Sequence, residues 1–240
     1  MCGIAGFVDF NKKLESTDVE LMTQALEHRG PDFGDTEFIN EKNYHLGFGH
    51  RRLAIIDVSE CSNQPQFYDS KRYWIVYNGE VYNYKEIRTI LIDLGHKFET
   101  DSDTEVVLRS YVEWGCEAIN KFIGMFAFSI LDKAKQKIIL FRDRAGVKPL
   151  FYYFKDGIFL FSSELKSFHT ISKFNKEIDI NSVSMFFRHG YISSPHSIYK
   201  YARKVLPGHY LEICLKNMQT KIYKYWDVID KYNEEKLDIT

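Results

Sequence analysis

The chain opens with Met1-Cys2-Gly3-Ile4-Ala5-Gly6-Phe7, and this stretch decides how the rest of the sequence is interpreted. Removal of the initiator methionine, expected before a residue as small as cysteine, leaves Cys2 with both a thiol and a free α-amine. Unperturbed, these groups titrate near pH ~8.5 and ~7.7–8.0, close to neutral working pH. An N-terminal amine that serves as base for its own nucleophilic side chain is an established catalytic arrangement. A retained methionine would turn that amine into an amide and block the site.

The ordinary alternative is that Cys2 is a small apolar residue before a buried strand, which we predict over residues 3–9. The remaining cysteines, Cys61, Cys116 and Cys214, are widely scattered and show no metal-ligand spacing, so no metal site is expected. Free thiols are typical of a reducing cytosol.

The 240 residues suffice for one large domain or two small ones with a substantial core. A formal charge of −1 without a basic stripe argues against a nucleic-acid partner. No apolar run reaches membrane-spanning length, and no basic-then-apolar leader opens the chain. We therefore expect a cytoplasmic protein with no membrane partner. The 16 tyrosines and 19 phenylalanines favour a strand-rich fold.

Apolar periodicity and capping residues predict three main helices, over residues 17–28, 83–94 and 103–114. The first should bury Leu21, Met22 and Leu26, and Asn83 should cap the second. Strands are predicted over 44–57, 73–77, 125–131, 137–143, 150–153 and 157–162, with short helices over 164–169 and 179–188 and a last hairpin over 205–225. The charged residues 227–240 have no clear apolar face and suit a linker or tail.

Two segments supply candidate polar groups for a site. Arg51 and Arg52 follow each other in an extended run, so their side chains point to opposite faces and one of them can enter a site. A buried arginine needs an anionic partner, and a carboxylate meets its forked geometry. After the strand at 73–77 come Asn78-Gly79-Glu80, ordinarily a hairpin signal, but here a helix follows. The Asn78 side-chain amide and the Gly79 N–H are two donors, enough for an oxyanion hole.

Asp103 lies in the first turn of the third predicted helix. A carboxylate at this position is favoured by the helix dipole, which also keeps it ionised, as a site for an ammonium group requires. The plain structural alternative is that Asp103 only complements the dipole.

The order of these pieces resembles the glutaminase domain of class II glutamine amidotransferases, most of all the N-terminal half of asparagine synthetase. The resemblance rests on motifs in a shared order over residues 2–226, with 227–240 as linker or tail: Cys2-Gly3-Ile4, His28-Arg29-Gly30-Pro31-Asp32, Arg52-Leu53-Ala54-Ile55-Ile56-Asp57, Asn78-Gly79-Glu80, Ser102-Asp103, Gly124-Met125-Phe126-Ala127-Phe128 and Asp143-Arg144 with Gly146. The His-Arg-Gly-Pro-Asp loop favours the asparagine-synthetase branch over relatives that make glucosamine phosphate or phosphoribosylamine.

This resemblance implies an α+β fold of the N-terminal-nucleophile hydrolase type, a four-layer αββα sandwich with two antiparallel sheets between helices. It implies hydrolysis of L-glutamine to glutamate and ammonia, with Cys2 as nucleophile and Asn78 and Gly79 as oxyanion hole. The implied substrate contacts are Arg52 for the α-carboxylate, Asp103 and Glu80 for the α-ammonium, and the backbone of Leu53, Ala54, Ile55 and Ile56.

The resemblance also sets expectations about partners. No cofactor is expected in this chain, because the Ser- and Gly-rich ATP loop of the family's synthetase domain is not found in these residues. ATP and Mg²⁺ would enter only with a synthetase domain or partner subunit that receives the ammonia. The sequence leaves open a homodimer and the identity of the ammonia acceptor. It also leaves open a non-catalytic regulatory or assembly module that keeps the fold. Hydrolysis of another amide is disfavoured by the Arg52 and Asp103 pair.

Overall fold

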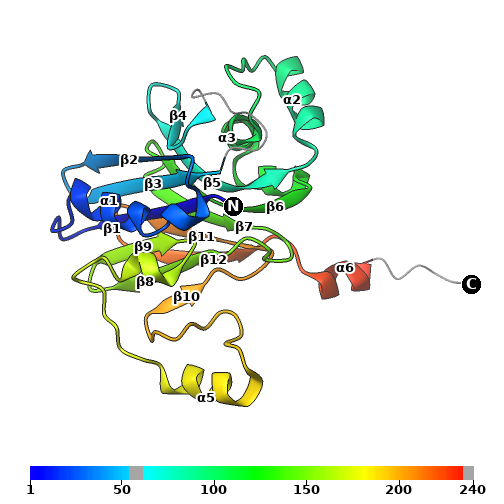
Figure 1. The fold of residues 1–240 in the computed structure, drawn as a ribbon. Helices are drawn as coiled ribbons and strands as arrows, with labels where there is room; N and C mark the ends of the chain where they lie inside the picture. Colours follow the sequence, from blue (N-terminus) through cyan, green and yellow to red (C-terminus); the bar gives the residue numbers. More distant parts are fainter. Residues whose placement is uncertain (54–61, 235–240) are drawn as a thin grey trace, which may run out of the picture.

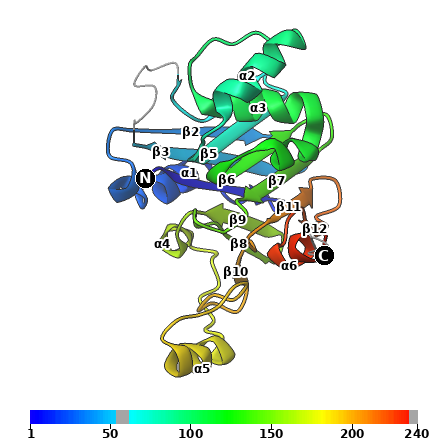
Figure 2. The same cartoon turned by 90° about the vertical axis from the view of Figure 1, so that its right-hand side faces the viewer.

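A computed structural model describes residues 1–53 and 62–234 of the chain. Its strands form two antiparallel sheets that lie face to face (Figures 1 and 2). The first sheet has the order β10-β8-β9-β1-β3-β2 and the second the order β12-β11-β7-β6-β5-β4. The strands of the first sheet are β1 (Gly3–Asp9), β2 (Phe33–Asn40), β3 (His45–Arg52), β8 (Phe151–Lys155), β9 (Ile158–Ser162) and β10 (Ala202–Lys204). Those of the second are β4 (Gln66–Tyr68), β5 (Tyr73–Val81), β6 (Gly124–Asp132), β7 (Lys137–Arg142), β11 (His209–Cys214) and β12 (Thr220–Lys224).

Alternation along the strands divides the apolar side chains between layers. In β5, Trp74 and Val76 belong to the core between the two sheets, whereas Ile75 and Tyr77 belong to the core under the helices of the second sheet. Side chains of a strand point alternately to its two faces, so a strand that is apolar on both faces must be covered on both. The apolar run at 73–77 therefore marks a strand buried between layers.

Helices cover the outer face of each sheet. On the first sheet lie α1 (Ser16–Gln24) and the short α4 (Leu165–Phe168), which bury Met22 and Phe168 in one cluster. On the second lie α2 (Tyr84–Asp93) and α3 (Asp103–Trp114). The 3₁₀ turns η1 (Glu27–Arg29) and η3 (Gly115–Lys121) follow α1 and α3. The predicted four-layer αββα sandwich is confirmed.

Strand β5 was predicted to end at Tyr77, but it continues through Asn78-Gly79-Glu80 to Val81. Strand β6 pairs with it throughout, with Gly79 opposite Phe126, so no turn is needed. A Cβ on Gly79 would lie 2.5 Å from the carbonyl oxygen of Met125. The glycine thus permits close packing of the two strands and does not form a hairpin.

The helix boundaries and faces also differ from the prediction. Helix α1 begins at Ser16, where the Asp18 carboxylate accepts the backbone N–H of Glu15, and ends at Gln24. Leu21 is 47% exposed and does not belong to the buried face. Asn83 occupies the N-cap position of α2, as predicted, but its side chain makes no bond to the first turn of the helix. Its amide instead bonds the backbone of residues 121 and 123, which precede β6.

Two helices lie outside the layers. Helix α5 (Ile180–His189) stands away from both sheets, and the predicted helix over 179–188 is confirmed (Figures 1 and 2). Helix α6 (Val228–Glu234) forms in the segment expected to be a linker or tail and was not predicted. The domain boundary before residue 227 stays a prediction. Within the described residues, no helix is long and apolar enough to cross a membrane.

Candidate active site

A cavity of about 180 Å³ lies where the first two residues of the chain meet the ends of β3 and β5 and the start of α3. Its lining includes seven of the predicted site residues, namely Cys2, Arg52, Leu53, Asn78, Gly79, Glu80 and Asp103. The other three, Ala54, Ile55 and Ile56, lie outside the described residues. Residues as far apart as Cys2 and Asp103 therefore share one cavity, as a common site requires.

Cys2 faces the backbone of Leu53 across this cavity. Its Sγ lies 3.4 Å from the Leu53 nitrogen, which donates to it, and 3.6 Å from the Leu53 carbonyl oxygen. Burial raises the pKa of the Cys2 thiol, while the Leu53 N–H and the positive charges of the chain terminus, Arg52 and Lys148 oppose that rise. Met1 lines the same cavity. Because its peptide bond makes the Cys2 nitrogen an amide, that nitrogen becomes a free amine only after Met1 is removed.

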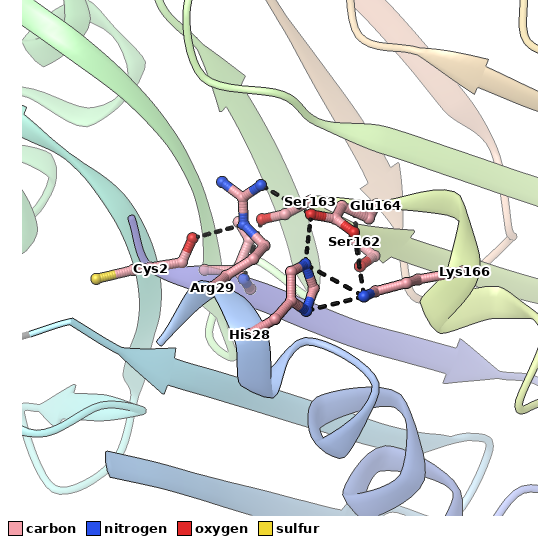
Figure 3. Close-up of polar contacts among 8 residues, drawn as sticks. Cys2, His28, Arg29, Ser162, Ser163, Glu164 and Lys166 are labelled. Atoms are coloured by element: carbon pink, nitrogen blue, oxygen red, sulfur yellow. Dashed lines mark hydrogen bonds and ion pairs between the residues drawn. The ribbon is translucent and has the colours of Figure 1, made fainter. Parts of the chain in front are cut away.

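The backbone of Cys2 is held by residues from two distant segments (Figure 3). Arg29 Nε donates to the Cys2 carbonyl oxygen at 2.9 Å, and Arg29 Nη1 pairs with Glu164 at 2.9 Å. Glu164 also contacts His28 Nε2 at 3.0 Å, and Lys166 lies 2.8 Å from the other ring nitrogen of His28. The Cys2 carbonyl is therefore tied through one buried guanidinium to the loop that follows β9.

Asn78 is almost fully buried, and its side-chain Nδ2 has no hydrogen-bond partner in the described part of the chain. A buried donor without a partner costs free energy, and such groups are uncommon outside functional sites. Because the residue lines the cavity that Cys2 enters, the amide is a donor awaiting an acceptor from a ligand.

His50 fixes the position of β5 relative to β3. Its Nε2 donates to the carbonyl oxygen of Tyr77 at 3.0 Å, directly before Asn78. Burial lowers the pKa of His50 to about 3, and the neighbouring charges of Arg51 and Arg52 act in the same direction. The ring is therefore neutral near pH 7 and ties the two sheets together beside the cavity.

Asp103 is buried at the N-terminus of α3, where its Oδ2 accepts from the Tyr77 hydroxyl at 2.7 Å and from the Val81 N–H at 3.0 Å. Burial raises the pKa of this carboxyl despite those hydrogen bonds, and the charge of Glu80 acts in the same direction. The prediction that the helix dipole keeps Asp103 ionised is therefore incomplete, because burial opposes the charged form. A cationic ligand would favour the charged form.

The two adjacent arginines point to opposite sides, as predicted. Arg52 is 8% exposed, lines the cavity and donates from Nη1 to Asn63 Oδ1 at 2.6 Å. Arg51 instead donates to the Gly30 carbonyl and pairs with Glu27 at 3.4 Å. Of the two arginines, Arg52 is therefore the one that can meet an anionic group in the cavity.

Several lining residues were not predicted, namely Ser62, Gln64, Tyr77, Ser102, Thr104 and Lys148. Gln64 accepts the Tyr77 N–H at 2.6 Å and donates to Thr104 at 3.3 Å, so it joins β5 to α3. Tyr77 was assigned to a strand, and its alternation with Val76 could have placed its hydroxyl on the side of α3. Nothing in the local sequence around Gln64 marks it.

A sequence model of the family described as "Glutamine amidotransferase domain" matches residues 1–226, and the chain belongs to this family. The resemblance inferred from the motifs is thereby confirmed.

Two relatives are similar along nearly the whole chain. A Methanocaldococcus jannaschii protein, provisionally named asparagine synthetase (glutamine-hydrolyzing) 2, is 40% identical over an alignment of 256 positions that covers 99% of this chain and 49% of that protein. Asparagine synthetase (glutamine-hydrolyzing) 3 of Bacillus subtilis is 38% identical over an alignment of 245 positions that covers 100% of this chain and 39% of that protein. The chain thus spans half or less of the length of these relatives.

Among solved structures, the chain resembles glutamine phosphoribosylpyrophosphate amidotransferase from B. subtilis, with a TM-score of 0.67 and 18% identity. The match covers 94% of this chain and 49% of that one. A structure described as the allosteric regulatory enzyme of purine biosynthesis gives a TM-score of 0.69, also at 18% identity. At this identity the likeness supports the fold alone.

Proposed function

We propose that this chain hydrolyses the side-chain amide of L-glutamine to glutamate and ammonia, and that a synthetase domain or partner subunit receives the ammonia. The observation that carries the proposal is the shared cavity. It places a thiol, an amide donor without a partner among residues 1–53 and 62–234, an arginine and two carboxylates around one space of about 180 Å³. Family membership and the relatives named as glutamine-hydrolysing asparagine synthetases support it.

The reaction would proceed through a thioester. Cys2 Sγ bonds to the amide carbon, and its proton passes to the α-amine freed by loss of Met1. Asn78 Nδ2 and the Gly79 N–H donate to the oxyanion that forms. The C–N bond breaks as the leaving nitrogen takes up the proton, and ammonia departs. Water then attacks the thioester, which releases glutamate and restores the thiol.

The charged end of glutamine would be held by groups of both signs. Arg52 would bind the α-carboxylate, and Asp103 with Glu80 would bind the α-ammonium. The ammonium would also offset the burial that raises the pKa of Asp103. A peptide-linked glutamine lacks both charges, so the site would select the free amino acid.

We propose that the acceptor chemistry lies outside residues 1–240, in a synthetase domain or a partner subunit. ATP and Mg²⁺ would be needed there. Because the relatives are named asparagine synthetases, aspartate is the first acceptor to test. A homodimer and a cytoplasmic location are further expectations.

The test is glutamate release by protein whose mass confirms loss of Met1. Incubation with L-glutamine from pH 6 to 9 should release glutamate, and the Cys2→Ser variant should not. A glutamine-like electrophile should modify Cys2. Absence of release at every pH would favour a non-catalytic module, and an adduct at another residue would defeat the assignment of the nucleophile.

A further inference from the structure

Lys148 brings a positive charge into the cavity that Cys2 enters. It lies between β7 and β8, is 8% exposed and lines the cavity. Its ammonium has no hydrogen bond or ion pair to any described residue, whereas Arg52 in the same cavity contacts Asn63. The Lys148 Nζ is not among the fully buried atoms that lack a partner, so its charge faces the open space of the cavity, where it can act on neighbouring groups.

The backbone of Lys148 is firmly held. Its N–H donates to Asp143 Oδ2 at 3.0 Å, and its carbonyl accepts from Arg142 Nε at 2.9 Å. Asp143 Oδ1 is taken up by the N–H groups of Ala145 and Val147. Asp143, the carboxylate nearest to Lys148 in sequence, therefore accepts hydrogen bonds from the loop backbone. The Lys148 side chain lines the cavity from a backbone that these bonds hold in place.

Charges from each neighbouring element bear on Cys2. Positive groups are the chain terminus before β1, Arg52 at the end of β3, and Lys148. Negative or titratable groups are Tyr77 and Glu80 on β5 and Asp103 at the start of α3. The two carboxylates are the groups proposed to meet the substrate ammonium, and Arg52 its carboxylate. Lys148 is therefore the cation left without a substrate partner.

We propose that the Lys148 ammonium stabilises the Cys2 thiolate and so increases the fraction of Cys2 that can act as a nucleophile near neutral pH. This inference rests on the proposed role of Cys2, and it assigns Lys148 an action through Cys2 without proton transfer. Burial raises the pKa of the Cys2 thiol and the Lys148 charge opposes it. An opposite charge within roughly 4–6 Å lowers a pKa by about 1–3 units, and a solvent-open cavity reduces that effect.

The test measures Cys2 alkylation as a function of pH, without glutamine. In this reaction the thiolate displaces iodide from iodoacetamide and forms an S–C bond. The rate is followed on the N-terminal peptide of the full chain after Met1 removal, between pH 6 and 10. Lys148→Met and Lys148→Gln remove the charge, whereas Lys148→Arg keeps it. Two charge-removing variants and thermal melts guard against loss of folding in either one.

We expect the midpoint of alkylation to move about one pH unit upward in the Met and Gln variants, with the rate at pH 7 falling about tenfold. The Arg variant should keep the wild-type midpoint. Lys135→Met, which removes a half-exposed lysine from a hairpin, should also keep it. Equal midpoints in all variants would overturn the proposal. So would a shift in the Arg variant as large as in the Met variant.

The outcome separates this inference from the proposed function. A shifted midpoint in a chain that never hydrolyses glutamine would support the role of Lys148 and defeat the glutaminase. Glutamine hydrolysis with coincident midpoints would support the glutaminase and defeat the role of Lys148.

Discussion

Arg29 Nε donates a hydrogen bond of 2.9 Å to the carbonyl oxygen of Cys2. The guanidinium is held in turn by Glu164, 135 residues further along the chain. The side chain of Arg29 is only 8% exposed, so the pair is shielded from solvent on one side. The orientation of the candidate nucleophile therefore depends on a carboxylate that lies outside the cavity.

Replacing Glu164 by glutamine should lower kcat with little change in KM. The variant keeps an acceptor for Arg29 but loses the negative charge, which weakens the hydrogen bond by about 1 kcal/mol. If that loss is expressed in the transition state, the rate falls by roughly fivefold. Steady-state glutamate release measures both constants. Lys166→Met removes a half-exposed partner of Glu164 and should change kcat by less than about twofold. A higher KM at unchanged kcat would show that Glu164 does not act through Cys2.

Asn78→Ala should reduce kcat by about 10²–10³ while KM changes little, because the amide is proposed to meet the oxyanion. Its Nδ2 has no partner in the described chain, so the melting temperature should stay close to wild type. Kinetics and thermal melts of the same preparation separate the two effects. Unchanged turnover would place the oxyanion hole elsewhere.

Asp103→Asn should raise the KM for glutamine without lowering stability. A hydrogen-bonded charge contributes about 2 kcal/mol, or roughly 30-fold in affinity. Burial raises the pKa of Asp103, so its contribution to stability is greatest below the unfolded pKa and is lost as pH rises through the folded pKa. Asparagine keeps an oxygen for Tyr77 and Val81 and avoids that loss.

We therefore expect the melting temperature of Asp103→Asn at pH 7 to match or exceed that of the wild-type protein without ligand. Denaturation of both proteins at pH 4 and 7 provides the check. A variant less stable than wild type at pH 7 would contradict the burial argument.

His50 should make the protein sensitive to acid. Burial lowers its pKa to about 3, whereas the unfolded value is near 6.5, so the folded state binds fewer protons between these values. Stability should fall as pH drops through this window, by up to about 1.4 kcal/mol per unit from this group. His50→Gln keeps a donor for the Tyr77 carbonyl but does not titrate.

The difference in unfolding free energy between wild type and His50→Gln should therefore shrink as pH falls from 7.5 to 5. Urea denaturation at each pH measures it, and other titrating groups cancel in the difference. A difference independent of pH would mean that His50 is not held neutral in the folded chain.

The sequence by itself determined most strands and helices, and its resemblance to a known family supplied the four layers and most of the candidate site. Apolar runs such as 73–77 marked the strands, and the motif order indicated Cys2, Arg52, Asn78 and Asp103 as one set. The strands and helices are recorded locally, because periods of 2 and 3.6 residues place side chains on definite faces.

Only the tertiary structure decided how that set is held and charged. The bonds from Arg29 to Cys2 and from His50 to Tyr77 depend on strand register and sheet stacking, which no short window contains. The same holds for β5, which continues past Asn78 because β6 lies beside it. Lys148 lines the cavity that Cys2 enters because the fold brings the loop between β7 and β8 beside the start of the chain. The burial of each charged group in that cavity, which the residue type does not fix, sets how strongly its charge acts.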